Sequence, residues 1–328
     1  CLDSLDALGV TRLITIGGDD TAFSALKLEQ RAQGRLQVVH VPKTIDNDLD
    51  LPHGIPTFGF QTARHIGVEL VKSLMVDAET TSRWYFVVTM GRKAGHLALG
   101  IGKAAGATLT IIPEEFRRKP IRLKTLVDIL VAAFIKRLAA GRSDGVAVLA
   151  EGLVEFLDQQ DLNGLEDVER DQHGHVRLAE VNFGVVLKRA VEGELRTFGV
   201  KTTIVEKNIG YELRCADPIS FDMEYTRDLG YCAAQFLLEG GNAAMVSIQN
   251  GRFIPIPFSD ILDPATGRTR VRMVDVESES YVIARRYMIR LSQEDLSHPQ
   301  DVVRLATAAG MAEDDFRKRF QYLMDKDV

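Results

Sequence analysis

Short apolar runs alternate along the chain with longer stretches in which apolar residues recur every three or four positions. The short runs are rich in Val, Ile and Thr, and several are apolar throughout, which is typical of strands buried on both faces. The longer stretches have the spacing of helices that pack one face against a core. Strands are predicted at 12–16, 37–42, 84–89, 108–112, 145–150, 201–206 and 244–249, and helices at 57–76, 94–106, 122–140, 180–196, 220–239 and 278–291.

This alternation predicts an α/β fold with parallel sheets and helices on both faces, in which active-site loops follow the carboxyl ends of the strands. Two polar segments, 157–178 and 262–277, carry turn-forming residues and mixed charge. We expect both to be surface loops or insertions.

Composition narrows the class of protein. The 328 residues suffice for one large or two medium domains, and 45% hydrophobic with 26% charged residues is ordinary for a globular protein. The formal net charge of -6 argues against a nucleic-acid or anionic-membrane partner, so a site for an anion must be local. Three scattered cysteines give neither a disulfide framework nor a metal cluster, and no apolar run is long enough to span a bilayer. A cytoplasmic location is expected.

The first candidate motif is Gly17-Gly18-Asp19-Asp20-Thr21, which lies between a buried strand and a helix expected to begin near Ala22. Paired glycines let backbone N–H groups approach phosphate oxygens, and the helix N-terminus adds positive partial charge. Asp19 could hold Mg²⁺, which prefers oxygen ligands. A plain strand–helix turn is the alternative interpretation.

The second motif is Pro42-Lys43-Thr44-Ile45-Asp46-Asn47-Asp48, which also follows a strand. Carboxylates at positions i and i+2 can enter one cleft with different surroundings, so that one acts as a general base while the other orients a neighbour or a metal. Phosphoryl transfer needs such a base, with cations on the phosphates and little else. An Asx-turn loop with solvated acids is the alternative.

Three further motifs complete the pattern. Met90-Gly91-Arg92 follows the third strand, Glu151-Gly152 follows the strand ending at Ala150, and the last is Gly210-Tyr211-Glu-Leu-Arg214. Together the five motifs resemble those of the phosphofructokinase family, and they stand in family order over residues 12–250. The resemblance implies two doubly wound domains of parallel-type sheets, and substrates that meet between them.

The resemblance also implies an organisation for the chain. A phosphoryl-donor domain would comprise 1–57 plus 212–260, and a fructose 6-phosphate domain 58–211 plus 261–328. Family members carry an earlier strand, a glycine-rich phosphate loop and an arginine, so we expect an N-terminal segment ahead of Cys1. Members share active-site residues between subunits, which implies a homodimer or homotetramer.

For the donor side, the resemblance implies transfer of a phosphoryl group to O1 of fructose 6-phosphate, a step of glycolysis. Asp46 matches the general base for the sugar 1-hydroxyl, with Thr44 beside the transferring group and Asp48 on the hydroxyl side. Asp19 matches the acid of a Mg²⁺ site. The donor-binding positions are Gly17, Gly18, Asp20, Thr21 and Lys43.

For the sugar side, Met90, Gly91 and Arg92 match the segment that lines the sugar phosphate, and the planar cationic group of Arg92 suits charge on the transferred group. Glu151 matches a carboxylate that accepts sugar hydroxyls. Tyr211 and Arg214 match the pair that binds the 6-phosphate. Arg83 matches an arginine that is donated across a subunit interface. For Arg83 an exposed cap at a strand start is the alternative.

The choice of donor depends on Asp20 and Lys43, because both positions are usually glycine in members that use ATP. A carboxylate about 4 Å from a phosphate charge costs roughly 1 kcal/mol in water and about 4 kcal/mol at an effective dielectric of 20. Lys43 offers a compact cation to a terminal phosphate. Because some ATP-using members carry the lysine, Asp20 is the more informative residue, and pyrophosphate is the predicted donor.

One departure and two rival functions stay open. The interface arginine expected near 200–207 is absent, and Lys207 or Lys201 could replace it. The nearest rival is an ATP-dependent 6-phosphofructokinase, or a related ketose-phosphate kinase of the same fold. The other is a catalytically silent regulatory subunit, against which the intact Asp46 and Asp48 argue. Single histidines such as His40 are expected to be packed or on the surface, and Glu114-Glu115 to begin a surface helix.

Overall fold

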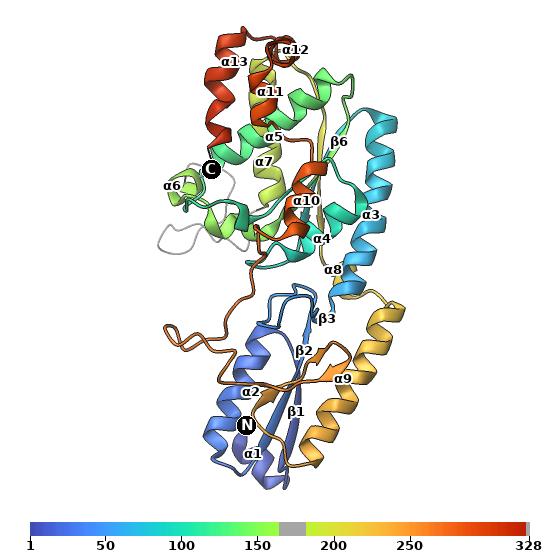
Figure 1. Cartoon of the computed structure of the whole chain (residues 1–328), viewed down its shortest axis with the longest axis vertical. Helices are drawn as coiled ribbons and strands as arrows, with labels where there is room; N and C mark the ends of the chain where they lie inside the picture. The colour runs from blue at the N-terminus through green and yellow to red at the C-terminus, as the bar shows by residue number, and fades with distance from the viewer. Residues whose placement is uncertain (164–181, 326–328) are drawn as a thin grey trace. The chain divides into compact units, whose positions relative to one another are not determined.

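The computed structural model describes residues 1–163 and 182–325 (Figure 1). The chain divides into two compact units, Cys1–His65 with Glu212–Met273 and Ile66–Tyr211 with Val274–Val328. The predicted domain borders were 57/58, 211/212 and 260/261, whereas the units divide at 65/66, 211/212 and 273/274. Two helices, α3 (Phe60–Thr81) and α8 (Tyr211–Arg214), run across these borders. Each unit has an α/β architecture with a mainly parallel sheet, which confirms the predicted fold class.

The first unit is built on a five-stranded sheet. Its strands follow the order β1-β2-β8-β11, with β3 also paired to β2. β1, β3 and β8 pair with β2 in parallel, and only β11 runs antiparallel to its neighbour β8. A short hairpin is formed by β9 and β10. The strands are β1 (Arg12–Gly17), β2 (Gln37–Thr44), β3 (Phe58–Gly59), β8 (Ala244–Met245), β9 (Ile248–Gln249), β10 (Arg252–Phe253) and β11 (Ile256–Pro257).

Both faces of β2 are covered, as its continuous apolar sequence predicts. Val38 packs in one core cluster with residues of α2 (Asp19–Ala32), whereas Val39 packs in another with residues of α9 (Ser220–Leu238). Successive strand residues point to opposite faces, so α2 and α9 flank the sheet (Figure 1). A short helix, α1 (Leu2–Ala7), precedes β1.

The second unit holds a fully parallel sheet in the order β5-β6-β4-β7. The two central strands, β6 and β4, are buried along their whole length, which explains why they read as unbroken apolar runs. Trp84 of β4 stacks on Phe134 of α5 (Leu123–Ala139) with ring centroids 5.0 Å apart. The strands are β4 (Trp84–Thr89), β5 (Leu109–Ile111), β6 (Gly145–Ala150) and β7 (Ile204–Ile209).

The core of this unit extends through α5 and α7 to the C-terminal helices, since Leu130, Leu187 and Phe316 belong to one buried cluster. The helices are α4 (His96–Ala105), α5 (Leu123–Ala139), α6 (Gln159–Asn163), α7 (Phe183–Thr197), α10 (Glu279–Tyr287), α11 (Gln293–Ser297), α12 (Pro299–Ala309) and α13 (Glu313–Phe320), with 3₁₀ turns at Pro113–Glu115, Glu151–Phe156 and Gln321–Met324.

The predicted elements are present, except that the predicted strand 244–249 is divided into β8 of the five-stranded sheet and β9 of the hairpin. Two shifts of element bounds are informative. β7 begins three residues later than predicted, at Ile204, and includes the polar run Glu206-Lys207-Asn208. It tolerates this run because it is an edge strand of its sheet. The helix α2 begins at Asp19 rather than near Ala22, so both aspartates of the first motif lie in its first turn. Of the predicted loop 157–178, the part from residue 164 lies outside the described residues.

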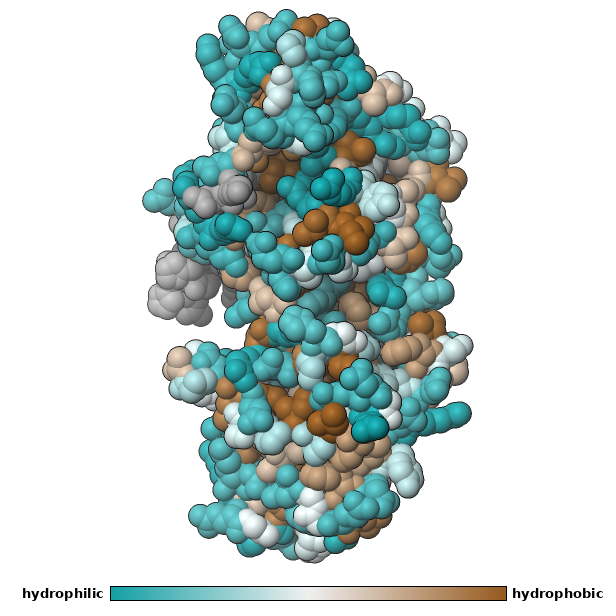
Figure 2. Space-filling model, in the orientation of Figure 1, coloured by the Kyte–Doolittle hydropathy of each residue, from teal (hydrophilic) through white to brown (hydrophobic). Residues whose placement is uncertain are grey.

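Within the described residues, no helix combines the length and the apolar composition needed to cross a bilayer. The face shown in Figure 2 is mainly hydrophilic, with hydrophobic residues in separate patches.

Candidate functional site

The first two motifs meet at the carboxyl edge of the first unit's sheet. β1 and β2 pair in parallel with Gly17 opposite Pro42, so Gly18, which directly follows β1, lies beside Lys43 near the end of β2. A Cβ atom on Gly18 would lie 3.5 Å from Cβ of Thr44, which shows how closely the two segments pack. The register of two strands therefore joins motifs that are 25 residues apart.

The turn itself requires glycine at position 17. A Cβ atom on Gly17 would lie 2.3 Å from Oγ1 of Thr21, far inside van der Waals contact. Gly18 has extended dihedrals and is the N-cap residue of α2, without a side chain to cap the first turn. The first turn of α2 thus has no side-chain cap, and the positive end of the helix is a place where an anion can bind.

Charges of both signs line this edge. Asp19 and Asp20 occupy the first turn of α2, where negative charge is favourable. Asp19 accepts a hydrogen bond from the hydroxyl of Thr269. Lys43 is half-buried, and in the part of the chain that the structure describes no carboxylate lies within ion-pair distance of its ammonium. An anionic ligand would supply the missing countercharge.

The loop after β2 carries two buried carboxyl groups, Asp46 and Asp48, which are 8% and 5% exposed. The backbone N–H of Asp46 donates to Oγ1 of Thr44 at 3.1 Å. Because this oxygen accepts from Asp46, the hydroxyl hydrogen of Thr44 is left to donate elsewhere. The loop thus places a hydroxyl donor directly beside a buried acid.

Sequence reasoning missed the residues that hold this loop. Thr57 donates through its hydroxyl to the carbonyl of Thr44 at 2.7 Å and through its N–H to Oδ1 of Asn47 at 3.0 Å. Arg272 binds the same Asn47 from the polar segment predicted to be a surface loop. The alternating pattern Arg-Thr-Arg-Val-Arg at 268–272 was the available signal, since alternation is typical of a strand-like segment packed on one side.

The other three motifs meet at the carboxyl edge of the second unit's sheet. Thr89 at the end of β4 lies opposite Ala150 of β6 and Ile209 of β7. Met90, Glu151 and Gly210 therefore leave three adjacent strands at one level. The N–H of Met90 donates to the carbonyl of Ile209 at 3.1 Å, which ties the first of these segments to the third.

Glu151 fastens the turn at Gly91-Arg92. Its Oε1 accepts the backbone N–H groups of Gly91 at 3.2 Å and Arg92 at 2.9 Å. Arg92 has a positive φ of 48°, a conformation that needs such support in a residue other than glycine. A Cβ atom on Gly152 would lie 2.1 Å from the carbonyl O of Arg92, so the two loops touch backbone to backbone.

Tyr211 and Arg214 begin and end the single turn of α8, and both are exposed. A Cβ atom on the preceding Gly210 would lie 2.9 Å from Cε of Met90, so α8 starts against the Met90 loop. The border between the units falls between Tyr211 and Glu212.

Arg83 is not brought to this edge. It precedes β4 at its amino end, and the six residues of the strand separate it from Met90 by about 20 Å. Lys207 lies within β7 and Lys201 ahead of it, and both are exposed. That Arg83 enters the active site of a partner subunit stays a prediction. That Lys207 or Lys201 replaces the interface arginine also stays a prediction.

The expectation that Glu114-Glu115 begins a surface helix was wrong. Glu115 forms an ion pair with Arg290 at 2.9 Å, with each side chain 8% exposed, and accepts the hydroxyl of Tyr281 at 2.6 Å. Glu114 accepts the N–H of Gly95 at 2.8 Å, and burial raises the pKa of its carboxyl group. Arg290 and Tyr281 come from segments distant in sequence, which a local pattern does not reveal.

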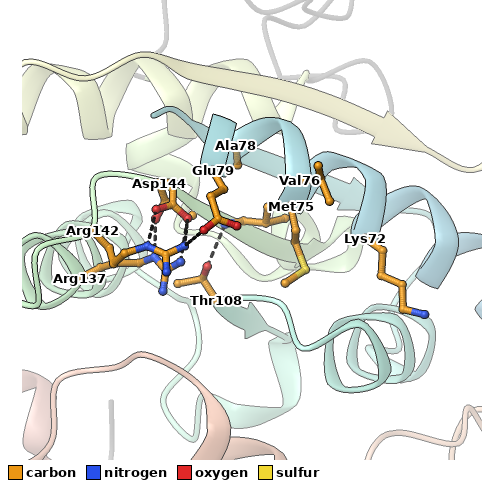
Figure 3. Close-up of a pocket in the computed structure, with 11 residues that line it drawn as sticks. Lys72, Met75, Val76, Ala78, Glu79, Thr108, Arg137, Arg142 and Asp144 are labelled. Carbon is orange, nitrogen blue, oxygen red and sulfur yellow. Dashed lines mark hydrogen bonds and ion pairs between the residues drawn. The ribbon is translucent and has the colours of Figure 1, made fainter. Parts of the chain in front are cut away.

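A cavity of about 410 Å³ lies at the opposite end of the second unit's sheet, near the amino end of β6 (Figure 3). Its arginines are already paired, since Arg137 and Arg142 contact Asp144 at 2.8 Å and 2.9 Å, and Arg142 contacts Glu79 at 3.1 Å. Asp144 consequently has a pKa lowered to about 2, because the hydrogen bonds and charges of the two arginines outweigh its burial. With its cations neutralised in this way, the cavity is a poor anion site.

The predicted site residues thus form two groups. The donor positions and the acids Asp19, Asp46 and Asp48 gather in the first unit, and the sugar-phosphate positions from Met90 to Tyr211 gather in the second. Among the described residues, no group of three or more His, Cys, Asp or Glu side chains is placed to hold a metal ion. Mg²⁺ does not require one, because it is commonly bound through one or two carboxylates together with substrate phosphates and water.

The chain is similar to known proteins over most of its length. The family model described as phosphofructokinase matches residues 1–237. A pyrophosphate–fructose 6-phosphate 1-phosphotransferase of Thermotoga maritima is 52% identical over 324 residues, which cover 97% of this chain and 77% of the relative. The enzyme of that name from Naegleria fowleri is 47% identical over 329 residues, covering 98% of this chain and 75% of the relative.

A solved structure gives the same fold. The crystal structure of a pyrophosphate-dependent phosphofructokinase from Nitrosospira multiformis matches with a TM-score of 0.63 at 19% identity, covering 87% of this chain and 68% of that one.

Proposed function

Because this chain belongs to the phosphofructokinase family, we propose that it transfers a phosphoryl group from pyrophosphate to O1 of fructose 6-phosphate, giving fructose 1,6-bisphosphate and orthophosphate. The observation that carries the proposal is the packing of Gly17-Gly18 against Lys43-Thr44, which sets a phosphate-binding turn beside a loop with two buried acids. The relatives from Thermotoga maritima and Naegleria fowleri, both named for this reaction, support the same assignment.

Asp46 is the general base in this proposal. Its carboxylate takes the proton of the sugar 1-hydroxyl while the O1–P bond forms and the bridging P–O bond of pyrophosphate breaks. Asp48 orients the hydroxyl side. The hydroxyl of Thr44, whose oxygen already accepts from the N–H of Asp46, donates to the transferring group. These residues position the reactants and stabilise charge, which is most of what an enzyme contributes to phosphoryl transfer.

Pyrophosphate suits the charges around the donor site. The amides at the start of α2 and the ammonium of Lys43 attract a terminal phosphate. Asp20 is exposed in the first turn of α2, where its carboxylate repels the additional phosphate of a nucleotide. The donor residues in the proposal are Gly17, Gly18, Asp20, Thr21 and Lys43.

The donor site also fits Mg²⁺, with Asp19 as the residue that would hold it. The carboxylate of Asp19 is partly exposed at the phosphate-binding turn, and the hydroxyl of Thr269 fixes its Oδ1. When bound, Mg²⁺ supplies positive charge that neutralises phosphate oxygens.

The sugar phosphate is assigned to the loops that follow β4, β6 and β7. Glu151 uses Oε1 to hold the Gly91-Arg92 turn, so its other oxygen can accept a sugar hydroxyl. Tyr211 and Arg214 are proposed to bind the 6-phosphate, with Met90 and Arg92 beside it. Three further points stay predictions: that the chain forms a homo-oligomer, that Arg83 enters the active site of a partner subunit, and that the protein is cytoplasmic.

A steady-state assay with two phosphoryl donors tests the proposal. Fructose 6-phosphate is offered with Mg²⁺ and either pyrophosphate or ATP, and fructose 1,6-bisphosphate is measured. We expect product with pyrophosphate and little with ATP. Turnover with ATP alone would contradict the donor assignment, and binding of fructose 6-phosphate without turnover on either donor would contradict the enzymatic role.

A further inference from the structure

We propose that Arg272 is a positioning residue for this reaction, and that its guanidinium holds the loop carrying Asp46 and Asp48 in the conformation that catalysis requires. The expected loss of activity in Arg272 variants rests on the proposed function. The structural part of the inference, that a half-buried arginine helps to hold the loop, concerns the first unit alone.

The N–H groups of the Arg272 guanidinium donate hydrogen bonds to oxygens of this loop. Nε and Nη2 donate to the carbonyl of Asn47 at 3.1 Å and 2.9 Å, and Nη2 also donates to the side-chain Oδ1 of Asn47 at 2.5 Å. Nη1 donates to the carbonyls of Leu51 at 3.1 Å and Ile55 at 2.8 Å. An arginine has five N–H donors, and all five are engaged within residues 47–55.

Asn47 is the residue on which these bonds converge, and it stands between the two acids. Its φ is 57°, in the left-handed region that asparagine tolerates better than most residues. Its Oδ1 accepts from both Arg272 and the N–H of Thr57. If Asn47 relaxed to a more common conformation, the chain would redirect Asp46 on one side and Asp48 on the other.

The backbone of the same segment reinforces the contact. The N–H of Arg272 donates to the carbonyl of Asp48 at 2.7 Å, and Val271 forms an isolated antiparallel bridge with Leu49. The hydroxyl of Thr269, two residues before Val271, donates to Asp19 of the first motif. A stretch of four residues therefore contacts both the acid proposed for Mg²⁺ and the loop proposed for catalysis.

Electrostatics add to this geometry. Arg272 is largely removed from solvent, and this burial lowers the pKa of its guanidinium, while the charges of Asp48 and Asp50 oppose the shift. An arginine stays protonated despite such shifts, so the segment brings a permanent positive charge close to Asp48. A cation there favours the ionised form of neighbouring carboxyl groups.

Lysine cannot replace this group. Its ammonium has three donors around one point, whereas the carbonyls of Asn47, Leu51 and Ile55 are bound by different nitrogens of a planar fork. Arg272→Lys therefore keeps the charge and most of the length and loses the geometry, which makes it the variant best suited to separate positioning from charge.

The test compares Arg272→Lys and Arg272→Gln with Arg268→Gln, which removes an exposed arginine of the same segment. We expect both Arg272 variants to lose kcat on the order of 100-fold, the effect of a displacement of about 1 Å at a reacting group. The KM for fructose 6-phosphate should change little, and Arg268→Gln should match the parent. Thermal unfolding of each variant shows whether it is folded. In Arg272→Ala, added guanidinium ion should restore part of the rate.

Hydrogen exchange of the amides in 44–57 gives a readout that does not need activity. We expect faster exchange there in Arg272→Lys than in the parent, and no change in Arg268→Gln. A folded Arg272→Lys that keeps the parent's kcat would overturn the inference, whether or not the loop exchanges faster. If the parent has no activity with pyrophosphate but the loop still loosens in Arg272→Lys, the proposed function fails while the structural part stands. Unchanged exchange in Arg272→Lys overturns that part as well.

Discussion

The imidazole of His40 lies against the turn at Gly17-Gly18, with Nε2 3.0 Å from the carbonyl O of Gly17. A carbonyl can only accept, so Nε2 carries the proton. On the other side of the ring, Nδ1 lies 2.9 Å from Oγ1 of Thr15 and accepts from that hydroxyl when the imidazole is neutral. His40 is completely buried, and this burial lowers its pKa to about 4, while the bond to Gly17 acts weakly in the opposite direction.

His40 should make the stability of the protein depend on pH. In the unfolded chain a histidine titrates near 6.5, so below that pH the unfolded state binds a proton that folded His40 does not take up until pH falls to about 4. Stability is therefore lost as pH falls from about 6.5 to about 4, by about 3 kcal/mol from this group alone. Chemical denaturation between pH 7 and pH 4.5 measures the free energy of unfolding.

The comparison variant is His40→Gln, which can still donate to Gly17 but has no proton to take up in this range. It should be less stable than the parent at pH 7, and the difference should narrow as pH falls. His53→Gln, at an exposed position, controls for the loss of a histidine as such. A difference between parent and His40→Gln that stayed constant with pH would show that His40 does not remain neutral in the folded protein.

Asp46→Asn should abolish turnover without abolishing binding. The amide keeps the size of the side chain but cannot accept the proton of the sugar 1-hydroxyl, and loss of a general base costs about 10²–10⁴-fold in rate. Calorimetry with fructose 6-phosphate should give an affinity close to that of the parent. An Asp46→Asn protein with substantial activity would remove Asp46 from its role as base. Asp50→Asn, four residues along and on the partly exposed side of the loop, is the matched control for a change of charge.

Much of this molecule could be predicted from local patterns, because three of the strands that build the two edges, β2, β4 and β6, are largely apolar and buried. β4 occupies the predicted residues 84–89, and β6 the predicted 145–150. β7 was shifted by three residues because an edge strand tolerates the charges of Glu206 and Lys207, which interrupt the apolar pattern. The motifs of both edges follow strand ends, so register alone brings them together.

The supports of the site could not be predicted in the same way. Arg272 binds Asn47 across 225 residues of sequence, and Glu115 binds Arg290 across 175. The residues next to Asn47 and Glu115 in the sequence give no indication of these partners. Arg272 lies in a polar segment whose composition is that of a loop. The alternation at 268–272 indicates packing on one side, but only the folded chain shows that the guanidinium binds residues 47–55.

Donor choice should respond to Asp20. Replacing Asp20 with glycine removes an exposed carboxylate from the first turn of α2 and with it the repulsion toward a nucleotide's additional phosphate. We expect kcat/KM for ATP to rise by about one to three orders of magnitude, which corresponds to the roughly 1 to 4 kcal/mol of a charge pair at about 4 Å. Asp3→Gly, in the first turn of α1, is the control for loss of a helix-terminal acid.

Lys43→Gly should weaken the binding of pyrophosphate. Loss of the half-buried ammonium removes a cation from the phosphate-binding edge, so the KM for pyrophosphate should rise while the KM for fructose 6-phosphate stays near that of the parent. Steady-state kinetics with each substrate varied in turn measures both. Equal increases in the two KM values would indicate general damage to the site rather than loss of a donor contact.

Gly152 provides a test of the sugar-phosphate edge. Alanine at this position would place its Cβ 2.1 Å from the carbonyl O of Arg92, and that atom belongs to the backbone, so the Arg92 turn must move. We expect Gly152→Ala to cost about 1–3 kcal/mol of stability, as overpacking does, and to raise the KM for fructose 6-phosphate more than the KM for pyrophosphate. Gly193→Ala is the matched control, because an added Cβ there meets nothing within 4 Å on the exposed side of α7. It should stabilise the protein by about 0.5–1 kcal/mol through helix propensity and leave both KM values unchanged. If Gly152→Ala bound fructose 6-phosphate as tightly as the parent, the turn at Gly91-Arg92 would not be the part of the site that grips the sugar phosphate.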